Sequence, residues 1–405
     1  MRQPGFLRYW AALSISSFGE QISILALPLC AALMLKASPS QMGMLVALEM
    51  LPFVLLSLPA GVWLDRHIKK PTLIFFEISN GLALASIPLA WSCGWLSMPW
   101  LYVAAFVVGC GNVVGGSCVQ ILSMQIVGRE HLIDAQSKFA LTDSLARLLG
   151  PGLAGLLVHA LNPPLALLFN GCAFLCTVKL FHSIRIKEEI QPPNGQSVWN
   201  DILEGLRFVW RHPTLRALAW TTAGWQILFN GFVALQVLYA TREFNMSAGT
   251  LGLVQMAGGL GVLLSSTAVK PLVARFGSGN VILCGMSGTV FCWLLLALLP
   301  VQLFGSNLLS LGAYGLVFFL FDCTVMLYFM PYLALRVRVT PDAYLGRVVS
   351  TMRFLTVAGV PLGAWCAGKL GEWLGLREAL GCVAAGGLIL ALLAWLITPL
   401  RGCRD

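Results

Sequence analysis

Acidic residues inside long apolar segments are the residues of this sequence that could do chemistry. Glu20, Glu49 and Asp322 each lie within such a segment. An ionisable group at the centre of a bilayer costs about 2.5–3.5 kcal/mol on insertion scales, so each of these acids needs a physical reason. A desolvated carboxyl group can bind and release a proton near neutral pH. The three acids are therefore candidates for proton coupling. The alternative for each is a protonated, hydrogen-bonded structural acid.

The composition explains why these acids are expected to lie in lipid. The chain has 405 residues, of which 58% are hydrophobic and 11% charged, whereas a soluble domain carries roughly 25% charged residues. Because so few charges cannot cover a soluble protein of this length, lipid must solvate most of the surface. The twelve cysteines are scattered, without a CxxC pair or a His/Cys cluster, so the sequence predicts no metal site, no disulfide framework and no cofactor.

Reading between charge clusters gives twelve apolar segments, each long enough at 1.5 Å per residue to cross a bilayer. They run approximately over residues 7–35, 40–63, 71–92, 98–127, 137–159, 163–184, 214–241, 248–270, 279–301, 307–335, 343–370 and 375–399. The predicted fold class is therefore an all-α membrane protein.

The positions of Lys and Arg set the expected orientation. With a cytoplasmic N-terminus, most basic residues fall on the cytoplasmic side, and Lys36, Arg242, Lys369 and Arg377 fall on the other. This bias predicts that both termini are cytoplasmic. The net charge of +9 is then explained by the orientation of the protein in the membrane, and it does not indicate a nucleic-acid-binding surface.

The longest polar stretch, residues 185–213, divides the chain into two halves of six segments, residues 1–184 and 214–405. Its second part has the periodicity of an amphipathic helix on the cytoplasmic interface. The apolar stripe of that helix comprises Trp199, Ile202, Leu206 and Val209.

The two halves match at an offset of about 210 residues, which predicts a parallel repeat with a binding site between the halves. Pro151 corresponds to Pro361, and Asn112 corresponds to Asp322. Asp143 falls opposite Arg353 in the same alignment.

The sequence "GVWLDRHIKK" (61–70) concentrates charge between the second and third segments. It resembles the signature loop of the major facilitator superfamily, G-x-x-x-D-R/K-x-G-R-R/K. Gly61, Asp65 and Arg66 match the first part, and Lys69 and Lys70 match the closing pair. The loop departs from the pattern at residue 68, where isoleucine replaces the second glycine. The resemblance implies twelve helices in two pseudo-symmetric halves.

The resemblance also implies a gating role for this loop. Asp65 would lie near the positive N-terminal end of a helix in the second half, with Arg129 as a possible ion-pair partner. The alternative is that Arg66, Lys69 and Lys70 only fix the topology, which leaves Asp65 unexplained because acids contribute little to topology.

A second motif, "LLGPGLAG" (148–155), resembles the Gly-Pro motif of exporters and antiporters of this superfamily. Pro151 removes a backbone donor, and Gly150 permits close helix contact. The spacing of the segments and the stretch "LPFVLLSLPAGVWLDR" (51–66) are similar to those of the branch of enterobactin exporters and macrolide efflux proteins. The resemblance implies a secondary active exporter of small, siderophore- or drug-like molecules, driven by proton antiport through alternating access. The alternative is proton-coupled or facilitated uptake of a small metabolite.

Further candidate residues follow from spacing within the segments. Asp143 and Arg147 are four residues apart and should pair on one helix face. Trp225, Gln226 and Asn230, together with Asn112, could line a substrate cavity. The alternative for this set is helix–helix hydrogen bonding and packing.

No Walker A loop, HExxH motif or nucleophile elbow is present in the sequence, so we do not expect an enzyme. The expected partners are a small-molecule substrate, protons as the coupling ion and the lipid bilayer, with no nucleic acid. We expect a multi-pass monomer in a bacterial cytoplasmic (inner) membrane.

Overall fold

The computed structural model describes residues 4–65, 67–127, 132–184, 188, 198–341 and 344–403. Within these residues, twelve helical segments are long and apolar enough to cross a membrane. They overlap the twelve predicted segments one for one, which confirms the all-α membrane fold.

The chain divides into two compact units. Unit 1 comprises Met1–Ala37, Leu48–Asn194 and Ser247–Met256, and unit 2 comprises Ser38–Ala47, Gly195–Met246 and Ala257–Asp405. The predicted halves assign residues 38–47 to the first half and residues 247–256 to the second, whereas the contact units have these two segments exchanged. The boundaries of the predicted halves stay a prediction.

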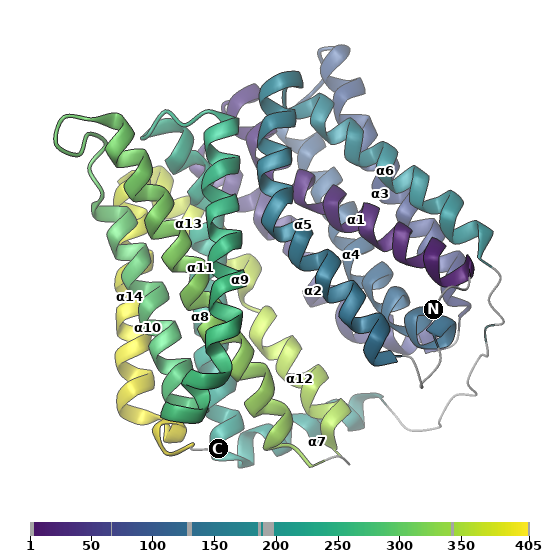
Figure 1. Ribbon diagram of the computed structural model, residues 1–405, viewed down its shortest axis with the longest axis vertical. Helices are drawn as coiled ribbons and strands as arrows, with labels where there is room; N and C mark the ends of the chain where they lie inside the picture. The colour runs from purple at the N-terminus through teal and green to yellow at the C-terminus, as the bar shows by residue number, and fades with distance from the viewer. Residues whose placement is uncertain are drawn as a thin grey trace. The chain divides into compact units, whose positions relative to one another are not determined.

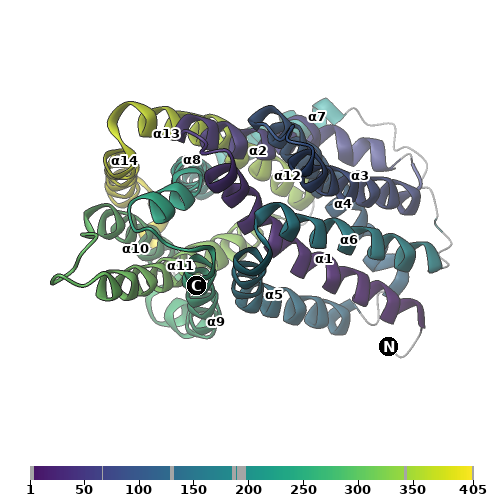
Figure 2. The ribbon, with the colours of Figure 1, turned by 90° about the horizontal axis from the view of Figure 1, so that it is seen from above.

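Unit 1 is built around its first helix. Its helices are α1 (Pro4–Leu29), which continues as a π-helical turn η1 (Cys30–Met34), most of α2 (Pro39–Asp65), α3 (Lys69–Ser92), α4 (Met98–Val127), α5 (Leu132–Leu161) and α6 (Pro163–Ser183). Helix α1 packs against α5 and α6, and α3 packs against α4 and α6 (Figure 2).

Unit 2 contains α7 (Val198–Arg211), α8 (Pro213–Arg242), most of α9 (Ala248–Phe276), α10 (Ser278–Leu298), α11 (Asn307–Arg338), α12 (Leu345–Val357), α13 (Val360–Leu374), α14 (Leu376–Ile397) and the 3₁₀ turn η4 (Pro399–Gly402). Helix α8 packs against α13 and α14, and α10 packs against α11 and α14 (Figure 1). These contacts repeat the pattern of unit 1 with α8 in the place of α1, as the predicted repeat requires.

Each exchanged segment is held by a close crossing of glycines. In unit 1, a Cβ atom at Gly155 of α5 would lie 2.7 Å from the carbonyl oxygen of Ala248 in α9. In unit 2, a Cβ atom at Gly43 of α2 would lie 2.5 Å from the carbonyl oxygen of Ala364 in α13. Such backbone-to-backbone packing is possible only with small residues at the crossing.

The two proline-containing segments that match in the repeat differ in continuity. Helix α5 runs without a break through Pro151. The eleventh segment breaks at Ala358 and Gly359, which separate α12 from α13, and Pro361 lies in the first turn of α13. Proline lacks an N–H donor and is tolerated best in the first turn of a helix, which explains the position of this break.

The amphipathic helix predicted in the linker is present as α7. It packs against α12 and α8 within unit 2, and Figure 1 shows it beside α12. Val209 of the predicted stripe is buried and Leu206 is half-buried. Trp199 and Ile202 are helical, but their side chains lie outside the described part of the chain.

Candidate functional site

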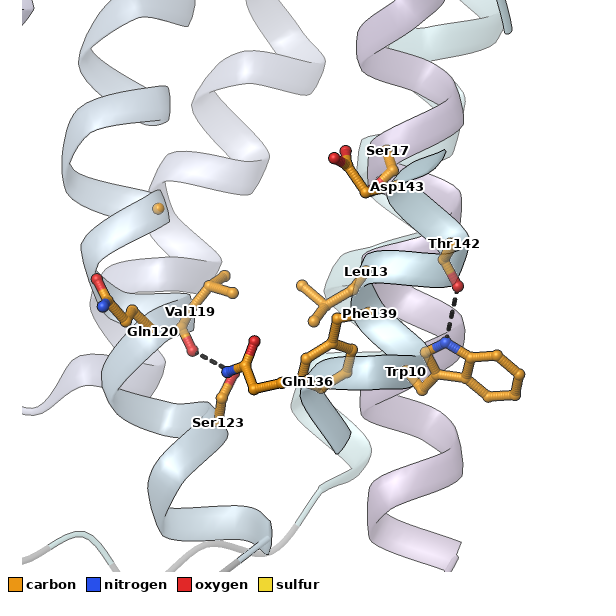
Figure 3. Close-up of a pocket in the computed structure, with 11 residues that line it drawn as sticks. Trp10, Leu13, Ser17, Val119, Gln120, Ser123, Gln136, Phe139, Thr142 and Asp143 are labelled. Carbon is orange, nitrogen blue, oxygen red and sulfur yellow. Dashed lines mark hydrogen bonds between the residues drawn. The ribbon is translucent and has the colours of Figure 1, made fainter. Parts of the chain in front are cut away.

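A pocket of about 360 Å³ lies between α1, α4 and α5 in unit 1 (Figure 3). Its walls combine two aromatic rings with amide, hydroxyl and carboxylate groups. The lining residues are Trp10, Leu13, Ser17, Gly116, Val119, Gln120, Ser123, Gln136, Phe139, Thr142 and Asp143. A concave site with apolar walls and a few converging polar groups is the usual form of a small-molecule site.

Helical periodicity places the α1 and α5 residues in this pocket. Trp10, Leu13 and Ser17 are spaced by three and four residues, so they share one face of α1. The indole Nε1 of Trp10 donates a hydrogen bond of 2.9 Å to Oγ1 of Thr142 (Figure 3). This bond fixes the register between α1 and α5 at the pocket.

The α4 wall is held by a buried tyrosine. The hydroxyl of Tyr9 donates to the carbonyl oxygen of Val119 at 2.7 Å and lies 2.9 Å from Oγ of Ser123. Because Tyr9 has no exposed surface, these bonds satisfy a polar group that would be costly to bury alone. They anchor α4 to α1 beside the pocket.

An ion pair stands at the Asp143 side of the pocket. Nε of Arg147 donates to Oδ2 of Asp143 at 2.9 Å, which confirms the predicted pairing along α5. Both side chains are more than half exposed. Glu20, one helical turn beyond Ser17 on α1, is also exposed and lies within range of the charges of both residues. The charge of Arg147 therefore acts on two carboxylates, of which Asp143 is its ion-pair partner.

Close helix packing sets the position of Glu20. A Cβ atom at Gly150 of α5 would lie 2.6 Å from Cβ of Gln21, so glycine lets α5 approach α1 next to Glu20. On the other side of α1, Nδ2 of Asn170 in α6 donates to Oγ of Ser23 at 2.6 Å. Helix α1 is thereby held from two sides, within one turn of Glu20.

Glu49 belongs to the same electrostatic group. It is half-buried on α2, and the charge of Glu20 acts on it. A Cβ atom at Gly109 of α4 would overlap the carbonyl oxygen of Glu49, so α2 and α4 approach closely here. Asn112 is half-buried on α4, four residues before the pocket residue Gly116 and thus on the same helix face.

The structure therefore joins charged sequence candidates from three helices of unit 1, α1, α2 and α5. Glu20, Glu49, Asp143 and Arg147 form one charged group, which we call the acid cluster, next to the pocket. Within the described residues, no group of three or more His, Cys, Asp or Glu side chains could hold a metal ion.

Comparison with known proteins decides the family. The family model described as "Major Facilitator Superfamily" matches residues 9–355.

The chain belongs to the Major Facilitator Superfamily.

Relatives within this superfamily match the chain over nearly its whole length. The uncharacterized MFS-type transporter YfiS of Bacillus subtilis (strain 168) is 27% identical, covering 94% of this chain and 91% of that protein. The multidrug efflux pump Tap of Mycolicibacterium fortuitum is 26% identical, covering 99% and 97%. The enterobactin exporter EntS of Citrobacter koseri is 24% identical, covering 92% and 87%. The protein is therefore a membrane transporter and not an enzyme.

Solved structures show the same fold. The nucleoside transporter NupG superposes with a TM-score of 0.76 at 10% identity, covering 97% of this chain and 98% of that chain. A bacterial homologue of the iron transporter ferroportin superposes with a TM-score of 0.74 at 16% identity, covering 98% of each chain.

The major facilitator signature loop lies partly within the described residues. Gly61 and Asp65 form the last turn of α2, although nothing is described of the Asp65 side chain. Arg66 and Arg129 lie outside the described residues, so their proposed pairing with Asp65 stays a prediction. The ring of His67 stacks on Trp63 with ring centroids 4.3 Å apart.

The two lysines that close the signature loop have structural partners that the sequence did not reveal. The backbone N–H groups of Lys69 and Lys70 donate to the carboxylate of Glu188 at 2.5 and 2.9 Å, which caps the N-terminus of α3. In return, Nζ of Lys70 donates to the carbonyl oxygens of His182 and Ile184 at the end of α6. Lys69 is buried, so the view of both lysines as topology charges alone was incomplete.

Glu77 is another acid of unit 1, about two turns from the start of α3. The structure buries it, and Oγ1 of Thr177 in α6 donates a hydrogen bond to its carboxylate. The reason is that Glu77 faces α6 rather than lipid, and this partner satisfies a polar group that could not stay unpaired there.

Asp322, the proton-coupling candidate of unit 2, lies between helices. It is half-buried on α11, and a Cβ atom at Gly258 of α9 would overlap its carboxylate. Sγ of Cys323, the next residue, donates to the carbonyl oxygen of Gly261 at 3.3 Å. Asp322 therefore packs at the contact of α9 with α11.

The aromatic candidates of unit 2 lie in its packed interior. Trp225 is only 2% exposed and stacks on Phe229 and near Tyr328, with ring centroids 4.8 and 4.7 Å apart. Nδ2 of Asn230 donates to the backbone oxygen of Gln226 at 3.0 Å, and both residues are half-buried. These contacts match the packing alternative for Trp225.

Sequence reasoning missed most of the pocket. Trp10, Gln120, Gln136 and Thr142 were not selected, because they come from three helices that only the fold brings together. A signal was present: Trp10, Ser17 and Glu20 share one face of an otherwise apolar helix.

Proposed function

We propose that this transporter is a secondary active exporter of small organic molecules that exchanges substrate for protons. The observation that carries the proposal is the ion pair of Asp143 with Arg147 at the pocket, with Glu20 within range of the charges of both residues. The relation to the efflux pump Tap and the enterobactin exporter EntS over most of the chain supports export of drug- or siderophore-like compounds.

The shared arginine couples the proton to the substrate in this proposal. When Glu20 is ionised, it competes for Arg147, and the carboxylate of Asp143 becomes available to a donor group of a substrate in the pocket. When Glu20 is protonated, the competition ends and Arg147 pairs with Asp143, which removes the substrate's partner. Substrate and proton then exclude each other, which is the thermodynamic requirement of antiport.

Glu49 has a supporting role in this scheme. It is a second carboxyl group on which the charge of Glu20 acts. In this proposal the two acids share the transported proton. Asn112, on the pocket face of α4, is proposed to contact substrate.

Asp322, Gln226 and Asn230 are proposed to shape the substrate path without carrying the proton. Asp322 packs against Gly258, and Gln226 accepts a hydrogen bond from Asn230.

We also propose a bacterial cytoplasmic membrane location with both termini in the cytoplasm. An even number of candidate spans supports termini on the same side, and the distribution of Lys and Arg favours the cytoplasmic side. Fusions of a reporter to each terminus test this, and a periplasm-active reporter that works at either terminus would contradict it.

Transport in proteoliposomes tests the exporter proposal. An imposed pH gradient should drive ethidium or enterobactin against the direction of proton flow. Movement of the compound together with protons would instead indicate uptake by symport, and a lack of any response to the gradient would contradict proton coupling.

A further inference from the structure

Helix α7 has one face fixed to the rest of unit 2. A Cβ atom at Gly205 would lie 2.9 Å from the carbonyl oxygen of Arg347 in α12, so the two helices touch closely. Nη1 of Arg347 donates to Oε2 of Glu204 at 2.8 Å. The ring of Phe208 stacks on Tyr344 with centroids 4.7 Å apart and an interplanar angle of 15°. This helix is therefore part of the folded unit rather than a loose linker.

The other face of α7 is exposed and combines apolar with basic side chains. Leu203 is 46% exposed and Trp210 is 62% exposed. Arg207 and Arg211 are exposed as well. Positions 203, 207, 210 and 211 are spaced by four, seven and eight residues, so they share one side of the helix. We call these four residues the α7 outer face.

The α7 outer face lies directly beside a membrane-spanning helix. Only His212 separates α7 from α8, which begins at Pro213 and is one of the twelve spans. A short helix next to the end of a span lies at the level where acyl chains meet headgroups. Tryptophan is enriched at this level because its ring is apolar and its N–H group is polar.

Most of the described charged side chains at this end of unit 2 are basic. Exposed basic residues at the ends of the neighbouring elements are Arg216, Lys270, Arg275, Arg338 and Arg401. Among the described side chains at this end, the acidic one is Glu204, and it pairs with Arg347. Clusters of Lys and Arg at a membrane surface attract anionic lipids.

We infer that the α7 outer face is a binding surface for the headgroups of anionic phospholipids. Arg207 and Arg211 contact the phosphate groups, while Leu203 and Trp210 enter the region between headgroups and acyl chains. Because Glu204 and Phe208 connect α7 to α12, bound lipid also stabilises the contact between these two helices. This inference depends on neither the direction of transport nor its coupling.

Thermal unfolding of the purified full-length protein in detergent tests the inference. Phosphatidylglycerol should raise the unfolding temperature more than phosphatidylcholine does. Arg207→Gln combined with Arg211→Gln should raise the half-saturating fraction of phosphatidylglycerol by roughly thirtyfold, because each basic group at an anionic lipid surface contributes about 1 kcal/mol. The effect of phosphatidylcholine should not change.

A matched control loses the same charge elsewhere at this end of the unit. Lys270→Gln combined with Arg275→Gln, on α9, should keep the phosphatidylglycerol effect. An equal loss in both double variants would overturn the inference, because it would show a response to overall charge.

Hydrogen exchange locates the bound lipid independently. Phosphatidylglycerol should slow amide exchange in peptides covering residues 203–211 more than phosphatidylcholine does. Equal exchange in the two lipids, or protection only in other helices, would contradict binding at α7.

Discussion

Unit 1 and unit 2 repeat the same helix contacts but carry different chemistry at matching positions. Glu20 of α1 corresponds to Asn230 of α8 at the offset of 210 residues, and Asp143 of α5 corresponds to Arg353 of α12. In unit 1 these positions form the acid cluster beside a polar pocket. The two units therefore share one helix arrangement, and differences at a few matching positions determine which unit carries the acid cluster.

Unit 2 fills the equivalent region with aromatic rings. Phe229 stacks on Phe321 with centroids 5.9 Å apart, and Trp225 lies between Phe229 and Tyr328. The hydroxyl of Tyr328 donates to Oγ1 of Thr222 at 2.7 Å, so this buried polar group is satisfied. The difference suggests that unit 1 handles the proton, while the interior of unit 2 provides rigid packing.

The largest expected effect separates the acids of the two units. Glu20→Gln removes the titratable group that competes for Arg147 and should abolish the response of transport to a pH gradient. A coupling of about 1–3 kcal/mol corresponds to a loss of roughly 5- to 150-fold. Asp322→Asn should retain most of the response. Rates in proteoliposomes measure both variants, and the reverse ranking would place the proton site in unit 2.

The next effect compares the loss of stability when a Cβ atom is added to the glycine that packs against each acid. Gly109→Ala places a Cβ atom against the backbone of Glu49, which cannot move easily, and should destabilise the protein by about 1–3 kcal/mol. Gly258→Ala meets the carboxylate of Asp322 and the ring of Phe318, which are side chains and can rotate, so its cost should be smaller. Thermal unfolding checks this order.

Gly116→Ala is the control for both glycine variants, because a Cβ atom there meets nothing within 4 Å. It should unfold at nearly the same temperature as the unmodified protein. Destabilisation as large as that of Gly109→Ala would show that the close approach to Glu49 is not the cause.

A smaller effect distinguishes the pocket from the aromatic interior. Trp10→Phe and Tyr328→Phe each remove one hydrogen bond and should lower stability by about 0.5–1.5 kcal/mol. Only Trp10→Phe should also weaken binding of ethidium or enterobactin, since Trp10 lines the pocket. Fluorescence titration measures the affinities. Weaker binding in Tyr328→Phe alone would assign the substrate to unit 2.

The smallest expected effect compares one ion pair from each unit. A double-mutant cycle on Asp143 and Arg147, which are 2.9 Å apart, should give a coupling of about 0.5 kcal/mol because both groups are exposed. The pair of Lys369 and Glu372 in unit 2, at 3.8 Å, should give a coupling near zero. Equal coupling energies in the two pairs would contradict a special role of the Asp143–Arg147 pair in the proposed exchange of substrate and proton.

The sequence was sufficient for the fold and for part of the site. Apolar length alone predicts each span, because the bilayer imposes a minimum length on a helix. The pairing of Asp143 with Arg147 follows from their spacing on one helix. The proximity of Glu20 to that pair does not follow from the sequence, because it depends on how Gly150 lets α5 approach Gln21.

Contacts that join distant segments were also beyond the sequence. The carboxylate of Glu188 caps α3 at Lys69 and Lys70, more than a hundred residues away along the chain. The burial of Glu77 against Thr177 is of the same kind. In both cases the charge pattern is visible in the sequence, but the partner is set by tertiary packing.

Direct observation of proton movement tests the central claim that Glu20 links proton and substrate. Proteoliposomes that contain a pH-sensitive dye and no imposed gradient are given an outward gradient of ethidium or enterobactin. As the compound leaves, the lumen should acidify in vesicles with the unmodified protein and should not acidify with Glu20→Gln. Acidification of the same size in Glu20→Gln, or substrate efflux without any change of luminal pH in the unmodified protein, would contradict the account.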